Sequence, residues 1–247
     1  MTKPFFCNDD VPTVSLCGVS KAYRRGAAAT TVLDDVDLTV RSGEFAFLAG
    51  PSGSGKTTLL SILGCILAAD RGGVELFGKD IAALGPQDRT LLRRDKIGFV
   101  FQRFHLIRGL TALENVCVPM TLRGVAARAA HSRARELLQA VGLGKHLDAH
   151  PKNLSAGQCQ RIAIARSLAN DPALVLADEP TASLDAKNGQ EVMRLLRRLV
   201  TQEGKTAVVV THDSRIFSFA DHIHWLENGR IVEQHSPLLG EHLEVVV

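Results

Sequence analysis

The eight residues Gly50–Thr57 constrain the fold more than any other segment of the chain. They read Gly-Pro-Ser-Gly-Ser-Gly-Lys-Thr, two glycines around four free residues followed by Lys and Thr, which is the pattern of a phosphate-binding loop. That pattern needs a strand before it and a helix after it. The segment 44–49, which is apolar after Glu44, predicts a buried strand, and 58–63 predicts the first turns of a helix. We therefore expect an α/β fold built around a phosphate-binding loop.

The chemistry expected of this loop follows from its residue types. Its glycines let backbone N–H groups turn inward around a phosphate chain, and the helix N-terminus adds partial positive charge. Lys56 would reach the β- and γ-phosphates, and the Thr57 hydroxyl would hold Mg²⁺. The alternative is a glycine-rich turn that binds nothing, and the flanking segments argue against it. The candidate nucleotide-binding residues of the loop are Gly50, Pro51, Ser52, Gly53, Ser54, Gly55, Lys56, Thr57 and Thr58.

A second candidate constellation follows a continuous apolar run at 173–177, which is typical of a parallel strand buried on both faces. Two carboxylates, Asp178 and Glu179, come directly after it. Asp178 is expected to help hold Mg²⁺. Glu179 should point the other way off the strand end and act as a general base toward water. A solvated strand end is the alternative for this pair alone, but together with the loop it favours nucleotide hydrolysis over simple binding.

Composition narrows the class of protein further. The chain has 247 residues, 45% of them hydrophobic, and a formal charge of +3, which excludes wholesale disorder and argues against a dedicated nucleic-acid binder. Its five cysteines are scattered without metal-ligand spacing and suit a reducing compartment. The longest apolar run, 59–69, is too short to span a bilayer, and residues 1–12 lack the apolar core of a signal peptide. We expect a soluble, cytoplasmic chain.

Hydrophobic periodicity gives a coarse order of elements. Strands are expected near 14–19, 32–40, 45–49, 74–76, 97–101, 173–177 and 207–210, and helices over 111–169 and 189–201. Asn228-Gly229 predicts a hairpin between strands at 223–226 and 230–233. These elements predict one domain at 13–247. Its core covers about 13–102 and 170–234, an inserted helical subdomain covers about 103–169, and 235–247 form a tail.

Four further motifs stand at characteristic positions. The segment 154–158 reads Leu-Ser-Ala-Gly-Gln before a helical run, although Ser155 with Gln158 is also an ordinary capping-box pattern. Gln102 ends the strand at 97–101, Asp185 lies shortly after the carboxylate pair, and His212 follows the strand at 207–210. In their order along the chain (Gln102, 154–158, Asp185, His212), and over about 14–232, they resemble the ATP-binding subunits of ATP-binding-cassette (ABC) transporters.

That resemblance implies a RecA-like P-loop core with an antiparallel β subdomain, and roles for single residues. Gln102 would sense Mg²⁺, His212 would contact the γ-phosphate, and the only tyrosine, Tyr23, would stack on adenine. The candidate catalytic residues are therefore Glu179, His212 and Gln102. The candidate ligands of the metal ion are Thr57, Gln102 and Asp178.

The resemblance also implies residues that act across a homodimer on ATP held by the opposite subunit. Ser155, Gly157 and Gln158 match the family's signature motif, whereas Ala156 stands where the family usually has glycine. The extra methyl group would crowd the phosphate or demand a different backbone. Asp185 belongs to the loop that crosses the dimer interface.

The stretches 99–107 and 110–116 look like the branch of macrolide-export, lipoprotein-releasing and cell-division ATPases, and 211–216 and 220–223 are similar to glycolipid exporters. This implies ATP and Mg²⁺ as cofactors and a membrane permease with a large extracytoplasmic domain, to which export-type members add a periplasmic adaptor protein. The permease would dock near 103–108 and 113–120 and hold the chain at the inner face of the plasma membrane. The expected function is ATP-driven export or extraction of a lipid, lipoprotein or drug-like substrate. The alternative is an ATPase that regulates a cell-wall hydrolase through a membrane partner.

Overall fold

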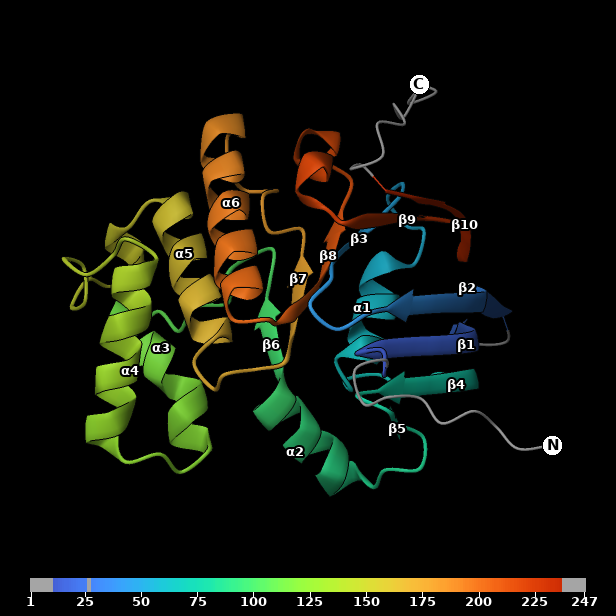
Figure 1. The fold of residues 1–247 in the computed structure, drawn as a ribbon, viewed down its shortest axis with the longest axis horizontal. Coiled ribbons are helices and arrows are strands. Elements are labelled where there is room, and N and C mark those ends of the chain that lie inside the picture. The colour runs from blue at the N-terminus through green and yellow to red at the C-terminus, as the bar shows by residue number, and fades with distance from the viewer. Residues whose placement is uncertain (1–10, 26–27, 237–247) are drawn as a thin grey trace.

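The computed structural model describes residues 11–25 and 28–236 and contains two sheets and a group of helices (Figure 1). The antiparallel sheet has the strand order β2-β1-β4-β5, and the larger sheet has the order β10-β9-β3-β8-β7-β6. The strands are β1 Val14–Arg25, β2 Ala28–Val40, β3 Phe45–Ala49, β4 Arg71–Leu76, β5 Lys79–Asp80, β6 Ile97–Val100, β7 Leu174–Asp178, β8 Thr206–Thr211, β9 His222–Glu227 and β10 Arg230–His235. The helices are α1 Lys56–Leu63, α2 Pro86–Lys96, α3 Ala112–Leu122, α4 Ala127–Ala140, α5 Ala156–Ser167 and α6 Ala186–Gln202, with 3-10 helices at Pro151–Asn153 and Ser214–Phe219.

The larger sheet is parallel except at one edge. Strands β9, β3, β8, β7 and β6 pair in parallel, and β10 joins β9 through an antiparallel hairpin. Asn228 and Gly229 form its turn with φ angles of 48° and 79°, which are the positive values that a type I′ turn needs. The predicted hairpin is confirmed, and so is the expected α/β fold with an antiparallel sheet and an inserted group of helices.

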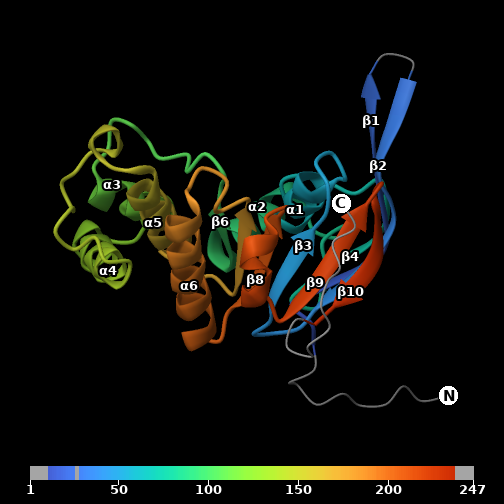
Figure 2. The same cartoon turned by 90° about the horizontal axis from the view of Figure 1, so that it is seen from above.

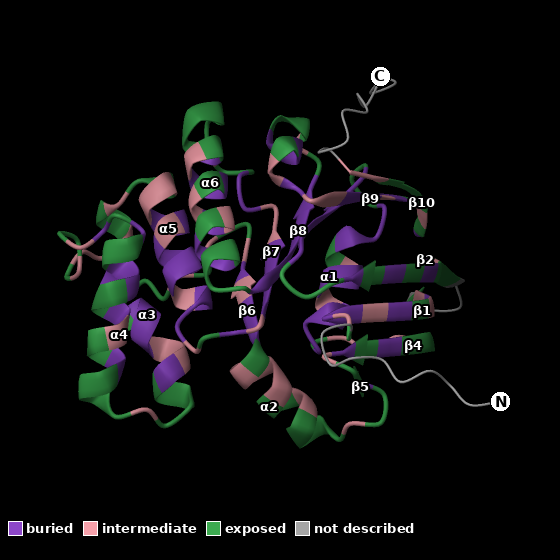
Figure 3. Ribbon diagram, viewed as in Figure 1, coloured by how far each residue is buried: buried purple, intermediate pink, exposed green. Residues whose placement is uncertain are grey.

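The central strands are apolar throughout because both of their faces are covered. In β7, Val175 and Ala177 face a core shared with the helices, whereas Leu174 and Leu176 face a second core toward α1 and the antiparallel sheet. Strand β8 alternates in the same way. Figure 3 shows this buried central layer between exposed outer surfaces. The strands' carboxyl ends are thereby held rigidly at one edge of the sheet.

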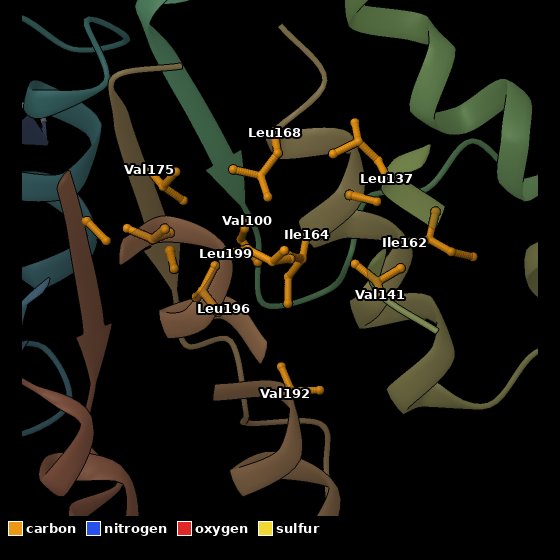
Figure 4. Close-up of a cluster of buried hydrophobic side chains, with 14 of the residues drawn as sticks. Val100, Leu137, Val141, Ile162, Ile164, Leu168, Val175, Val192, Leu196 and Leu199 are labelled. Atoms are coloured by element: carbon orange, nitrogen blue, oxygen red, sulfur yellow. The ribbon is translucent and has the colours of Figure 1, made fainter. Parts of the chain in front are cut away.

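Helices α3, α4 and α5 form a group at the far end of the molecule from the antiparallel sheet, and α6 lies beside α5 (Figures 1 and 2). Their shared core contains side chains from β6, β7 and four helices (Figure 4). It joins the helical group to the sheet through one continuous apolar cluster. The cluster includes Val100, Leu137, Val141, Ile162, Ile164, Leu168, Val175, Val192, Leu196 and Leu199.

Three features differ from the sequence prediction or lie beyond it. Helix α2 was not predicted, because all of its residues are at least partly exposed and it carries no apolar stripe; Pro86 at its start and cationic residues in its last turn favour it instead. Strands β1 and β2 extend further than predicted, as a paired ribbon out to Arg25 and Ala28. The proposed tail 235–247 lies almost wholly outside the described residues. Within 11–25 and 28–236, no helix combines the length and apolarity that a membrane crossing requires.

Candidate active site

One cavity of about 350 Å³ lies where α1 begins, at the carboxyl ends of β7 and β8. It collects side chains and backbone from five separate segments of the sequence. Its lining consists of Val32, Ser52, Gly53, Gly55, Lys56, Thr57, Thr58, Gln102, Asp178, Glu179 and His212. The phosphate-loop motif, the carboxylate pair, Gln102 and His212 therefore meet in one place.

The phosphate-binding loop requires glycine where it passes close to other backbone. Gly55 precedes α1 with φ 106°, and a Cβ there would lie 2.7 Å from the carbonyl oxygen of Val32. Gly50 has φ 142°, and its Cβ would lie 2.0 Å from the carbonyl oxygen of Leu226. Both the conformation and the space exclude a side chain at these two positions.

Lys56 lies inside this loop, with its ammonium group directed at the loop's own backbone. Its Nζ donates hydrogen bonds to the carbonyl oxygens of Gly50 and Pro51, both at 2.7 Å. The residue is 7% exposed, and burial lowers the pKa of its ammonium, an effect opposed by the charges of Glu179 and Asp178. A buried cation facing two carboxylates provides the positive charge that a phosphate chain needs.

Thr57 and Asp178 form a pair suited to a hard cation. The Thr57 hydroxyl donates to Asp178 Oδ1 at 3.3 Å, and burial raises the pKa of the Asp178 carboxyl, with the charge of Glu179 adding to that increase. Magnesium is usually bound by one or two protein oxygens together with phosphate and water oxygens. A hydroxyl and a carboxylate beside the loop fit that donor set.

Glu179 contacts His212 across the cavity. Its Oε1 lies 2.6 Å from His212 Nδ1, and its backbone N–H donates to the carbonyl of Val210 at 2.9 Å. The expectation that Glu179 points away from Asp178 is wrong, because both residues line the same cavity. The cause is the backbone: Glu179 has φ 46°, so the strand has already ended and its alternation of faces no longer applies.

Two buried oxygens at this site have no hydrogen-bond partner within the described part of the chain: Ser54 Oγ and Glu179 Oε2. Buried polar atoms are nearly always paired, so an unpaired acceptor or hydroxyl here indicates room for a ligand's hydrogen bonds. Glu179 thus has one carboxylate oxygen in contact with His212 and a second, buried oxygen that no described residue pairs with. The residues present fit a nucleotide with its metal ion.

Gln102 lies in the loop after β6, with its side chain exposed toward the cavity. The hydroxyl of Ser183 donates to its backbone carbonyl at 3.5 Å. This contact connects the Gln102 loop with the segment that leads to Asp185.

The remaining predicted site residues lie elsewhere in the fold. Tyr23 is on β1 and is 45% exposed. Ser155 caps α5: its hydroxyl accepts from the Gln158 N–H at 3.2 Å, and Gln158 Oε1 accepts from the Ser155 N–H at 2.9 Å. Asp185 caps α6 by accepting from the N–H of Asn188 at 3.0 Å. The role of Tyr23 toward adenine, those of Ser155, Gly157 and Gln158 toward a nucleotide on a second subunit, and that of Asp185 at a dimer interface stay predictions.

Asn188 connects the start of α6 with the start of α5. Its N–H donates to Asp185, the cap of α6, and its side-chain Oδ1 would lie 3.6 Å from a Cβ placed on Gly157 in α5. Val32 also lines the cavity that contains Lys56 and Glu179, although no sequence pattern predicted it as a site residue. It lies on β2, in the other sheet, so only the packing of the two sheets reveals it.

Comparison with known proteins identifies the family. The model of the family described as "ABC transporter" matches residues 33–182. A macrolide export ATP-binding/permease protein of Paracoccus denitrificans is 46% identical over 90% of this chain and 33% of its own length. The chain thus spans about a third of the length of the first curated relatives that it matches. An uncharacterized ABC transporter ATP-binding protein of Thermotoga maritima is 45% identical over 92% of this chain and 98% of its own length.

Solved structures agree with this match. A dimeric ATP-binding cassette in a post-hydrolysis state, bound to ADP and Pi, has a TM-score of 0.84 and 42% identity, and covers 90% of this chain and 98% of its own. The protein cbiO1 of Clostridium perfringens, part of the ABC transporter complex cbiONQ, has a TM-score of 0.83 and 26% identity, and covers 93% of this chain and 91% of its own. The chain is therefore an ATP-binding cassette ATPase of the ABC transporter family.

Proposed function

We propose that two copies of this chain close on ATP and Mg²⁺ and thereby drive a membrane permease in the export or extraction of a lipid, lipoprotein or drug-like substrate. The observation that carries the proposal is the Glu179–His212 contact of 2.6 Å beside the phosphate-binding loop. Such a pair suits hydrolysis and not mere nucleotide binding. The name of the Paracoccus denitrificans relative, a macrolide export protein, supports export as the direction.

The roles of single residues in the hydrolysis step follow from the geometry of the cavity. When bound, ATP with Mg²⁺ supplies an electrophilic γ-phosphoryl group whose charge the metal ion partly neutralises. Glu179 Oε2, which is free of partners in the described chain, accepts a proton from the attacking water. His212 holds the other oxygen of Glu179 and so fixes the direction of the carboxylate. Thr57 and Asp178 would hold the metal ion, and the ammonium of Lys56, which donates to loop carbonyls in the described chain, would donate to phosphate when the nucleotide is bound.

A homodimer would give a role to the predicted motifs that lie outside the cavity. Ser155 is exposed at the N-terminus of α5, where backbone N–H groups and the helix dipole favour an anion. Because the Ser155 hydroxyl oxygen already accepts from Gln158, its proton is available to donate to a phosphate oxygen. We assign Ser155, Gly157 and Gln158 to the nucleotide held by the partner, Asp185 to the interface, and Tyr23 to the adenine ring.

A groove of about 570 Å³ between α2, β6 and α3 is the proposed docking place of the permease. Its lining combines apolar side chains, including Phe99, Phe101 and Leu122, with the cationic groups of Arg93 and Arg94. Leu122 is 73% exposed beside the other apolar side chains of this groove, and an apolar patch rimmed by polar residues is typical of a surface that a partner covers. Docking here would hold the chain at the inner face of the plasma membrane. A periplasmic adaptor protein belongs to the proposal for an export system.

The test is purification of tagged full-length Glu179→Gln chain from detergent-solubilised native membranes in the presence of ATP and Mg²⁺. Loss of the general base should slow hydrolysis by roughly 10²–10⁴-fold while ATP binding persists, so the closed dimer accumulates with its partners. Glu75→Gln, at an exposed position on β4, is the matched control and should hydrolyse ATP like the wild type.

Mass spectrometry of the purified material distinguishes the possible systems. A permease with a large extracytoplasmic domain, with or without an adaptor, would support export or extraction. A permease with a cell-wall hydrolase would replace that proposal with division-type regulation. Ribosomes, nucleic acid or no membrane protein would refute the membrane partner. Wild-type hydrolysis by Glu179→Gln would refute the assignment of the base.

A further inference from the structure

The loop directly after Gln102 has an unusual backbone. Phe104 and His105 have φ angles of 59° and 46°, so two consecutive residues with bulky side chains take the left-handed conformation that favours glycine. The turn is closed internally: the N–H of Phe104 donates to the carbonyl of Phe101 at 3.1 Å, and that of His105 to Arg103 at 2.6 Å. The His105 ring stacks on the Phe101 ring with centroids 4.8 Å apart. Such a conformation persists only when surrounding contacts impose it.

The contact that imposes it comes from the last turn of α5. Arg166 Nη2 donates to the carbonyl of Phe104 and Nη1 to the carbonyl of His105, both at 2.6 Å. One guanidinium thus binds the carbonyls of both left-handed residues. Its planar fork suits two parallel acceptors, whereas a lysine ammonium is a single point donor without this fixed geometry. The side chain is half-buried, and this burial lowers the pKa of the guanidinium from its ordinary value.

The position of Gln102 depends on this turn. On its N-terminal side the chain is fixed by β6, which ends at Val100, and the Gln102 carbonyl accepts from Ser183. On its C-terminal side the turn itself is held by the bonds to Arg166 and the stack on Phe101, and the chain beyond it is anchored by Leu106 in the core and by Ile107, which exchanges hydrogen bonds with Asn115. Without Arg166 the strained turn would relax, and the side chain of Gln102 would lose its fixed direction into the nucleotide cavity.

We propose that Arg166 is a positioning residue for ATP hydrolysis: it holds the 101–105 turn in its left-handed form and so places Gln102 in the nucleotide cavity. The inference rests on the proposed function for the role of Gln102. It adds a direct link between the Gln102 loop and the predicted signature motif, because α5 is capped by Ser155 at its start and carries Arg166 in its last turn. It also adds a link to the permease, because Phe101, His105 and Arg166 line the proposed docking groove. A partner that fills the groove touches the same contact that places Gln102.

The first test is a double-mutant cycle on steady-state ATP hydrolysis with Gln102→Ala, Arg166→Ala and the double variant. Losing a group that orients a site residue typically lowers activity by about 10–100-fold. We expect that loss in kcat for Arg166→Ala, with KM for ATP within about threefold of wild type, since the binding loop is untouched. Adding Arg166→Ala to Gln102→Ala should lower kcat no further, because the residue it positions is already gone.

The control is Arg198→Ala, which removes another guanidinium that donates to a backbone carbonyl, that of Ala140 at 3.2 Å, far from the turn. It should keep wild-type kcat. Arg166→Lys, which retains the charge but not the fork, should fall between Arg166→Ala and wild type and serves in its place if the alanine variant does not fold. Losses that multiply in the double variant, or equal losses in Arg198→Ala, would show that Arg166 acts only on overall stability and overturn the inference.

A second measurement does not depend on catalysis. Hydrogen exchange of the nucleotide-free chain should show faster exchange of the amides of Phe104 and His105 in Arg166→Ala, with β7 unchanged. Unchanged exchange in the turn would overturn the inference whatever the kinetics show. If exchange accelerates but Glu179→Gln still hydrolyses ATP, the contact stands as structure and the proposed hydrolysis step has failed instead.

Discussion

Replacing His224 with leucine should make the free energy of unfolding decrease less when the pH is lowered. His224 lies on β9 beside β3, is 4% exposed, and both of its ring nitrogens lack a hydrogen-bond partner in the described part of the chain. Burial lowers its pKa from 6.5 to about 4, and the neighbouring His222 adds to the decrease. The folded chain therefore holds this imidazole neutral at pH values where the unfolded chain protonates it.

The sign and size of the effect follow from proton linkage. Between pH 6.5 and 4 the unfolded state binds a proton at His224 that the folded state does not bind, so stability falls as the pH decreases. The stability contribution is fully present above pH 6.5. A pKa decrease of this size lowers the free energy of unfolding by about 2 kcal/mol on going from pH 7 to pH 5, and by about 3 kcal/mol on going from pH 7 to pH 4. Leucine has a similar volume and carries no proton, so the variant should lack this part of the pH dependence.

The assay is urea unfolding of wild type and His224→Leu at pH 7 and pH 5, followed by circular dichroism. On going from pH 7 to pH 5, the wild type should lose about 2 kcal/mol more stability than the variant. With a typical dependence of stability on urea concentration, its unfolding midpoint should therefore fall by about 1 M more than that of the variant. His131→Leu, at an exposed position on α4, is the control and should keep the full pH difference of the wild type. Equal pH differences in wild type and His224→Leu would show that the imidazole is solvated or paired in the folded chain, and would refute the reasoning.

Three further outcomes concern the nucleotide site and the helix caps. Lys56→Ala should weaken ATP binding by roughly 10–100-fold, the worth of a charged hydrogen bond to phosphate, in a fluorescent-nucleotide titration; unchanged affinity would count against the whole site. Gly55→Ala should lower the free energy of unfolding by about 1–3 kcal/mol, because its Cβ meets the Val32 carbonyl at positive φ; wild-type stability would mean that the loop has a second conformation. Ser155→Ala should lower it by about 1 kcal/mol through loss of the cap on the Gln158 N–H, while Ser155→Asp should keep most of that stability.

Patterns that depend on local sequence predicted the larger part of this fold. The phosphate-binding loop and the buried strands β3, β7 and β8 could be predicted, since strands covered on both faces are apolar throughout. Helix α2 could not, because its residues gain little from burial and its stability comes from its ends. The prediction for the direction of the Glu179 side chain was also wrong. Side chains alternate between the two faces only along an extended strand, and the backbone at Glu179 has left that conformation.

Contacts between distant segments account for the rest of the site. Arg166 and His105 are 61 positions apart, so the sequence shows an arginine in a helix and a loop without any sign that one holds the other. Val32 belongs to a different sheet from the residues beside it in the cavity. In both cases the missing information is tertiary packing, which no local pattern contains.

The structure also clarifies the departure at Ala156 from the family's usual glycine. Ala156 is the first residue of α5 and exposed, and it is not among the described residues with positive φ. No glycine conformation is needed there, so the expectation that alanine demands a different backbone is wrong. In a helix, alanine is more favourable than glycine by up to about 1 kcal/mol, so Ala156 stabilises the turn that presents Ser155. Any effect of the methyl group on hydrolysis must then come from contact with the partner's nucleotide. Ala156→Gly would separate the two: a less stable α5 with faster turnover indicates such a contact, whereas a less stable α5 with unchanged turnover excludes it.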